Sequence, residues 1–178
     1  MENHTFVCAV LGLSDSGKSY LSRMLMQRVP GDTYILNKRD SDNSWNENVK
    51  NEEDRKFKSI SWETLGDPAF CVEASLVVED CISLSDSQLK ILRENICYRA
   101  HRKLNPQLMI FHSLTYSSLR RYLPLIHGII ISANMTSLPS LKAIIRYFET
   151  TPKEQEIIVN KFLSEAGNNY KFLYWCNA

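Results

Sequence analysis

Short continuous apolar runs alternate along the chain with stretches in which apolar residues recur every three or four positions. Continuous runs of this length are typical of strands buried on both faces of a parallel sheet. They predict strands at 5–11, 33–36, 57–62, 74–78, 108–111, 127–131 and 172–175. The periodic stretches predict helices at about 17–29, 85–102, 137–149 and 152–165. Alternating strands and helices indicate an α/β fold with a mostly parallel sheet covered on both faces.

Two of the predicted helices have a recognisable apolar stripe, which we expect to face the sheet. In the first helix, closed by Pro30 and Gly31, the stripe consists of Leu21, Met24, Leu25 and Arg28. In the helix capped by Ser85 or Asp86 it consists of Leu89, Leu92, Ile96 and Arg99. By contrast, residues 37–56 are polar and have no apolar period, so we expect a surface loop or excursion there.

The composition is that of an ordinary globular protein. A length of 178 residues predicts one domain spanning 1–178. Lys and Arg number 21, Asp and Glu number 20, and hydrophobic residues make up 44% of the chain. This balance excludes a disordered tail, a coiled coil and a strongly basic histone-like protein. A nucleic-acid partner would need a local basic surface or a ring of subunits that concentrates charge in its pore.

Nothing in the chain predicts a membrane span or a signal peptide, so we expect a soluble intracellular protein with no membrane partner. The five cysteines are Cys8, Cys71, Cys81, Cys97 and Cys176. Because their number is odd and no C-x-x-C pair occurs, they indicate neither a disulfide framework nor a zinc site. We interpret them as reduced and mostly buried.

The first predicted strand leads directly into Gly12-Leu-Ser-Asp-Ser-Gly-Lys-Ser19, which matches the phosphate-binding loop G-x-x-x-x-G-K-[ST] (Walker A). Glycines allow such a loop to bend tightly, so that backbone N–H groups and the start of the following helix surround a phosphate. Lys18 would reach the β- and γ-phosphates, and the Ser19 hydroxyl would hold Mg²⁺. The predicted ATP-binding residues are Gly12, Ser14, Asp15, Ser16, Gly17, Lys18, Ser19 and Tyr20.

A phosphate-binding loop also needs a carboxylate on a neighbouring strand, and the Walker B candidate is Leu76-Val-Val-Glu79-Asp80. We predict that Glu79 faces Mg²⁺ and that Asp80 polarises the attacking water, although the usual order of the two acids is Asp then Glu. The alternative is a solvated acidic turn, since adjacent strand residues point to opposite faces.

Residues Asn37-Lys38-Arg39-Asp40 resemble the guanine-reading N-K-x-D motif of GTPases. That motif follows a late strand in GTPases, whereas here it follows the second strand. We therefore reject guanine specificity and predict ATP as the nucleotide.

Taken together, the Gly12–Ser19 loop, the acids Glu79 and Asp80, and the Leu108–His112 strand resemble the genome-packaging ATPases of double-stranded DNA viruses. These are the poxvirus-type and adenovirus-type branch of the FtsK-HerA P-loop superfamily. The resemblance covers almost the whole chain, and includes Arg99-Ala-His-Arg-Lys-Leu-Asn105 and the terminal strand. It implies a three-layer α/β/α sandwich of the P-loop NTPase type.

The resemblance also implies an ATP-hydrolysing motor that forms a homo-oligomeric ring and threads double-stranded DNA toward a capsid or portal protein. A viral motor would work in the host nucleus or a cytoplasmic factory, or enter the virion. His112 would sense the γ-phosphate in place of the usual Gln or Asn, and Arg120 or Arg121, with Arg99 in reserve, would reach a neighbouring subunit's site. The structural alternatives are a histidine at the sheet edge and ordinary surface arginines.

Two other classes of function remain open. A nucleoside or nucleotide kinase also suits a short chain with a phosphate-binding loop, but Arg120 and Arg121 would make a poor kinase lid. The Glu-Asp order and His112 would also suit a nucleotide-binding scaffold with weak hydrolysis. Phosphate release with and without duplex DNA distinguishes the three.

Overall fold

Seven strands form one sheet in the order β3-β2-β4-β5-β1-β6-β7. They are β1 (Val7–Leu11), β2 (Thr33–Leu36), β3 (Phe57–Ser59), β4 (Ser75–Val78), β5 (Gln107–Phe111), β6 (Gly128–Ser132) and β7 (Phe172–Cys176). All pairs are parallel except β6 with β7, which pair antiparallel at one edge. The computed structural model describes residues 6–36, 45, 57–67, 74–102, 106–112, 119–132, 138–147, 151–165 and 171–176, with backbone alone at 98–102, 173, 175 and 176.

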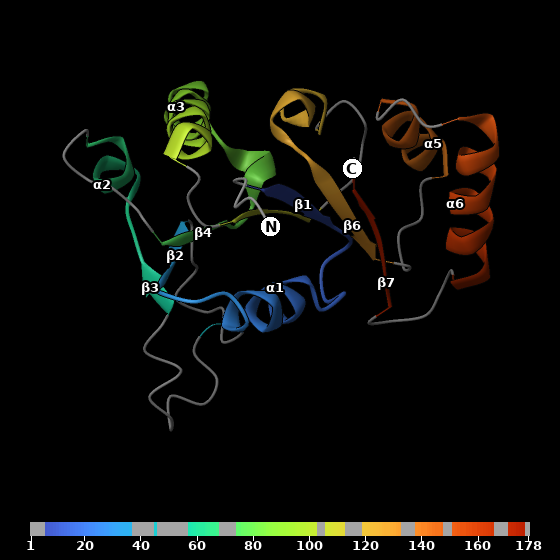
Figure 1. Ribbon diagram of the computed structural model, residues 1–178, viewed down its shortest axis with the longest axis horizontal. Coiled ribbons are helices and arrows are strands. Elements are labelled where there is room, and N and C mark those ends of the chain that lie inside the picture. Colours follow the sequence, from blue (N-terminus) through green and yellow to red (C-terminus); the bar gives the residue numbers. More distant parts are fainter. Residues whose placement is uncertain are drawn as a thin grey trace.

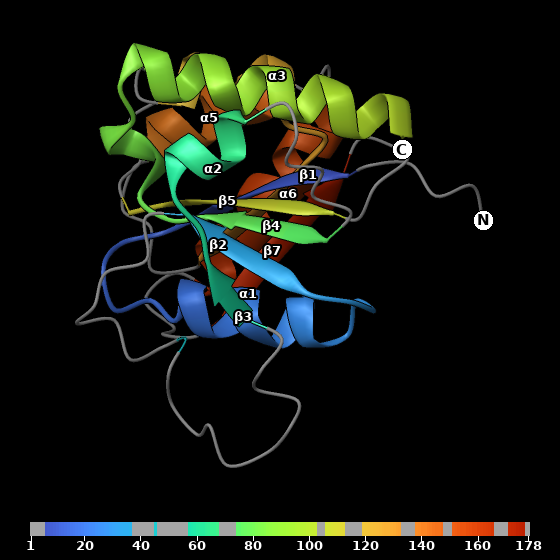
Figure 2. The same cartoon turned by 90° about the vertical axis from the view of Figure 1, so that its left-hand side faces the viewer.

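Helices lie on both faces of the sheet (Figures 1 and 2). They are α1 (Lys18–Gln27), α2 (Trp62–Gly66), α3 (Asp86–Arg102), α5 (Leu138–Tyr147) and α6 (Pro152–Glu165), with short 3₁₀ turns η3 (Cys81–Ser83) and η4 (Leu123–Leu125). Helix α1 lies on one face, whereas α2, α3 and α5 lie on the other, where α6 packs against α5. The predicted α/β fold with a mostly parallel sheet between helical layers is confirmed. Not one of the described helices is long and apolar enough to cross a membrane.

The central strands are buried on both faces, which explains why they appear in the sequence as continuous apolar runs. Along β1, Ala9 and Leu11 belong to the core beneath α3 and α5, whereas Cys8 and Val10 belong to the core beneath α1. We call these two packed regions the α3-side core and the α1-side core. Neighbouring strand residues thus bury opposite faces of one sheet.

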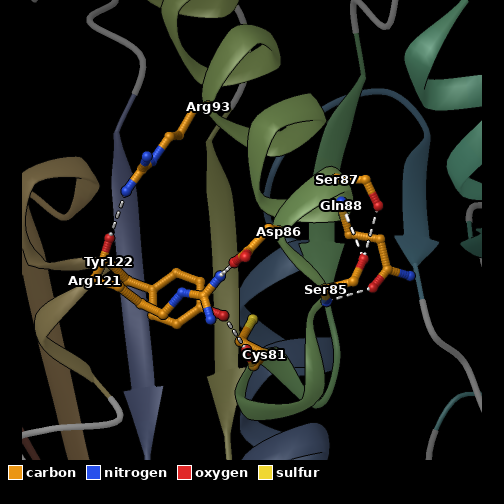
Figure 3. Close-up of polar contacts among 8 residues, drawn as sticks. All are labelled: Cys81, Ser85, Asp86, Ser87, Gln88, Arg93, Arg121 and Tyr122. Carbon is orange, nitrogen blue, oxygen red and sulfur yellow. Dashed lines mark hydrogen bonds and ion pairs between the residues drawn. The ribbon is translucent and has the colours of Figure 1, made fainter.

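The start of α3 is fixed by a reciprocal cap (Figure 3). The Ser85 Oγ accepts from the Gln88 backbone N–H at 3.3 Å, and the Gln88 side-chain oxygen accepts from the Ser85 N–H at 2.9 Å. This is the capping-box arrangement, which satisfies two backbone donors that a helix start leaves unpaired. Ser85, rather than Asp86, is therefore the cap. The predicted stripe of this helix is confirmed at the three residues whose side chains are described: Leu89, Leu92 and Ile96 are buried.

The predicted apolar stripe of α1 is wrong in part. Met24 and Arg28 are exposed, and the residues buried along this helix are Lys18, Ser19, Ser22 and Met26. Lys18, in the first turn of α1, donates back to the Leu13 carbonyl oxygen of the preceding loop, so a polar side of this helix is buried. Leu21 and Leu25, which are half-buried, line an apolar cavity of about 410 Å³ that opens between α1 and β7.

The predicted strand at 57–62 is also too long. β3 ends at Ser59, and α2 begins at Trp62, where the sequence had predicted no helix. Ser61 caps α2, because its Oγ accepts from the Thr64 N–H at 3.1 Å. A helix of five residues is too short to show an apolar period, so only its cap could have indicated it.

The polar stretch 37–56 was expected to lie on the surface, and one of its residues does not. Trp45 is 5% exposed and belongs to the α1-side core, where its ring lies 5.4 Å from the ring of Phe57. The rest of this stretch, including Asn37–Asp40, lies outside the described residues. A tryptophan has enough apolar surface to be buried even when its neighbours in sequence are polar.

The free cysteines follow the expectation in two of three positions. Cys8 and Cys81 are buried, whereas Cys97 is exposed on α3. Cys97 directly follows the buried Ile96, and consecutive helix residues point in different directions, so it lies off the packed stripe. The side chains of Cys71 and Cys176 lie outside the described residues.

Candidate functional site

Several of the predicted functional residues lie at the carboxyl edge of the sheet. Gly12 follows β1, Glu79 follows β4, His112 follows β5, and Ser132 ends β6. Because β1 lies between β5 and β6, and β4 lies next to β5, these four strand ends are consecutive in the sheet. The chain leaves β1 toward β2 on one side and later places β6 on the other. In open α/β sheets, ligands bind at the carboxyl ends of strands at such a point of reversal.

The loop Gly12–Ser19 is tightly bent and leads directly into α1. Asp15 and Gly17 adopt left-handed backbone conformations, with φ of 60° and 80°. At Gly12, a Cβ atom would lie 2.7 Å from both the Ser132 Cβ and the Ser16 Oγ, so only glycine fits. Left-handed residues in such a loop can turn successive backbone N–H groups to one side, an arrangement that suits anions.

Lys18 is folded back into this loop. Its side chain is 3% exposed, and its Nζ donates to the Leu13 carbonyl oxygen and to the Ser16 Oγ, the latter at 3.3 Å. Burial lowers the pKa of Lys18 from 10.5 to about 8, although the negative charges of Glu79 and Asp15 act in the opposite direction. Within the described part of the chain, the site therefore contains a poorly solvated cation whose hydrogen bonds go to neutral oxygens.

Glu79 is the buried carboxylate of the site, with 4% of its surface exposed. Its Oε1 accepts from the indole Nε1 of Trp45 at 2.8 Å, and its Oε2 lies 3.7 Å from Nε2 of His112. The negative charge of Glu79 also acts on Lys18, where it opposes the lowering of the pKa by burial. Three residues predicted from different parts of the sequence, Lys18, Glu79 and His112, thus lie together.

Asp80 occupies a different environment from Glu79. It has a left-handed backbone with φ of 52° and turns the chain from β4 into η3. Its carbonyl oxygen accepts from Ser83, at 3.1 Å from the backbone nitrogen and at 2.9 Å from the Oγ. Asp80 is half-buried. Left-handed conformations are uncommon for non-glycine residues, and Asp is among the residues that adopt them most readily.

A set of polar contacts joins the segment after β5 to the segment after β4 (Figure 3). The Tyr122 hydroxyl donates to the carbonyl oxygen of Cys81, the residue after Asp80, while the Tyr122 ring packs edge-on against Phe111. Burial raises the pKa of Tyr122 to about 12, so the hydroxyl keeps its proton at neutral pH. Tyr122 therefore ties the turn at Asp80 to the α3-side core.

The two candidate arginines have different surroundings. Arg121 lies on the α3 side, where its Nη2 is 2.8 Å from Asp86 Oδ1 and its guanidinium is 5.5 Å from the Tyr122 ring centre (Figure 3). Arg93 donates to the Arg121 carbonyl oxygen at 3.2 Å. Arg120 is exposed. Among the described contacts, neither arginine touches Lys18, Glu79 or His112.

No protein-family model matches the chain, and no curated protein is significantly similar to it in sequence. The ligand that the site can bind must therefore be inferred from the residues of the site. The tightly bent loop with its left-handed residues and the buried Lys18 suit a polyphosphate. The hydroxyl of Ser19, a residue that is 9% exposed, and the Glu79 carboxylate are oxygen ligands of the kind that Mg²⁺ prefers when it binds together with a nucleotide.

The other predicted binding residues differ in how exposed they are. Ser14, Asp15 and Tyr20 are exposed, with Tyr20 at 63%, whereas Ser16 is fully buried. The residue that the sequence did not identify is Trp45. The signal that could have found it is a lone tryptophan within an otherwise polar stretch.

Proposed function

We propose that this protein is a Mg²⁺-dependent ATPase in which Gly12–Ser19 is the phosphate-binding loop of a P-loop NTPase. One observation carries the proposal: a left-handed turn at Gly17 leads into a helix whose first residue, Lys18, is buried beside Glu79. A lysine folded against neutral oxygens can exchange them for phosphate oxygens without changing its backbone.

Each residue has a proposed role. Lys18 binds the β- and γ-phosphates, Ser19 and Glu79 hold the magnesium ion, and Asp80 orients and polarises the attacking water. His112, whose Nε2 lies near Glu79, donates to the γ-phosphate. Magnesium, when bound, neutralises negative charge on the phosphates.

We further propose that the protein works as a ring-shaped motor on double-stranded DNA, of the kind that packages viral genomes. The support is the resemblance of its motifs to that family and their placement on consecutive strand ends. Arg120, as an exposed arginine on the segment after β5, is then the candidate for a neighbouring subunit's site.

Phosphate release from Mg²⁺-ATP should be measurable, should rise with duplex DNA, and should fall to background in Lys18→Ala. The exposed Lys90 on α3 provides a matched control, and Lys90→Ala should behave as the parent. Release that requires a nucleoside acceptor would instead indicate a kinase, and binding without turnover a scaffold. If ATP does not bind at all, the proposed function is wrong.

The pH dependence of ATP binding should identify Lys18. A bound polyphosphate stabilises its ammonium form, so binding is coupled to proton uptake once the pH exceeds the free-protein pKa of about 8. Affinity measured by calorimetry in metal-free buffer should fall above pH 8, by up to about tenfold per pH unit. Lys18→Arg keeps its charge throughout and should remove this slope. An equal slope in both proteins would contradict the assignment.

A further inference from the structure

Trp45 makes a contact with the site that the proposed roles do not use. Its indole Nε1 donates to Glu79 Oε1 at 2.8 Å, across 34 positions of sequence. Both residues are buried, at 5% and 4% exposure, so water competes little with this hydrogen bond. The Trp45 ring is held in turn by Phe57 of β3, which gives the donor a fixed position relative to the sheet.

Because of this contact, the two oxygens of the Glu79 carboxylate have different surroundings. The indole N–H can only donate a hydrogen bond. Trp45 therefore bonds to Oε1 as a donor and has no lone pair to offer to a metal ion. Oε2 faces the other way, toward Nε2 of His112 at 3.7 Å. A carboxylate with one oxygen held by a buried donor has fewer orientations open to it, so Trp45 helps to fix the side of Glu79 on which Oε2 lies, toward His112.

We infer that Trp45 is a positioning residue for Glu79, which aims Oε2 at the magnesium ion of the bound nucleotide. The inference rests on the proposed function, because it assigns the support of a carboxylate that the proposed function uses. Partners that orient a metal-binding carboxylate from outside typically change metal affinity by about 10- to 100-fold when they are removed.

Trp45→Phe separates this role from simple packing, because phenylalanine keeps a ring against Phe57 but has no N–H. At a fixed ATP concentration, the Mg²⁺ concentration for half-maximal nucleotide binding should rise by about 10- to 100-fold. ATP affinity in metal-free buffer should stay close to that of the parent. Trp62→Phe on α2, the same substitution away from the site, should change neither quantity.

A spectroscopic measurement keeps the inference testable if Trp45→Phe does not fold. In a chain carrying Trp62→Phe and Trp175→Phe, Trp45 is the remaining tryptophan, since the sequence contains three. Its emission should shift when Mg²⁺ is added to the ATP complex, and Glu79→Ala should abolish that shift.

The outcomes separate the two proposals. The inference is overturned, and the proposed function is not, if the parent binds Mg²⁺-ATP but one of two results is found. The first is a Mg²⁺ requirement that is unchanged in folded Trp45→Phe, and the second is a Trp45 emission that does not change when Mg²⁺ is added. A parent that binds no ATP removes both the inference and the proposed function.

Discussion

Replacing Arg120 with alanine is expected to lower ATP turnover by about 10³- to 10⁵-fold, the range measured for arginines that stabilise the charge of a phosphoryl-transfer transition state. Arg120 is exposed, on the segment that follows β5 and His112. An arginine acting on a neighbouring subunit must be free to leave its own surface. ATP binding to the variant should be nearly unchanged, because in the proposed ring the residue would act only at the interface between subunits. Steady-state phosphate release under conditions in which the protein is oligomeric checks this.

Arg121→Ala is the matched control for Arg120→Ala. Its guanidinium is already paired with Asp86 and stacked near Tyr122, so its loss should have a small effect, typical of an exposed ion pair. Mixing Arg120→Ala subunits with Lys18→Ala subunits should restore some turnover, because some interfaces then combine an intact loop with an intact arginine. Absence of any restored turnover would contradict an arginine shared between subunits.

Asp80→Asn is expected to lower turnover by about 10²- to 10⁴-fold, the usual contribution of a positioned general base. Asparagine can adopt the left-handed backbone found at Asp80, so the turn into η3 and its bonds to Ser83 should persist. The variant should therefore bind Mg²⁺-ATP normally and hydrolyse it slowly. Calorimetry of binding beside single-turnover phosphate release separates the two steps.

Glu79→Gln should behave differently from Asp80→Asn. The glutamine oxygen can still accept from Trp45, but the negative charge that acts on Lys18 is lost. We expect weaker Mg²⁺ binding and a higher Mg²⁺ requirement for turnover. If Asp80→Asn keeps full hydrolysis while Glu79→Gln abolishes it, Asp80 is not the base.

The elements could be predicted where the chain is uniformly buried or strongly periodic. The strand at 33–36 and the helix at 152–165 have the predicted limits. The predictions were wrong where a few polar side chains decide the structure. Ser61 starts a helix of one turn, and the first turn of α1 buries Lys18 and Ser19 at the expense of Met24.

In the candidate site, too, some features could be predicted from the sequence and others could not. The bend at Gly12–Ser19 follows from local glycine chemistry, and the approach of Glu79 to His112 follows from parallel strands ending at one edge. The pairing of Arg121 with Asp86 spans 35 positions, and no pattern along the chain predicts it. The burial of Trp45 could not be predicted either, because its neighbours in the sequence are polar and indicate a surface loop.

By itself, the sequence determined the order of the strands and of the longer helices, the bend before α1 and the sheet edge where Glu79 and His112 lie, because these depend on local periodicity, glycines and strand direction. Three features were decided only by the tertiary structure. They are the hydrogen bond from Trp45 to one oxygen of Glu79, the ion pair of Arg121 with Asp86, and the burial that lowers the pKa of Lys18. Those features depend on burial and on contacts between distant segments, which form only when the layers pack.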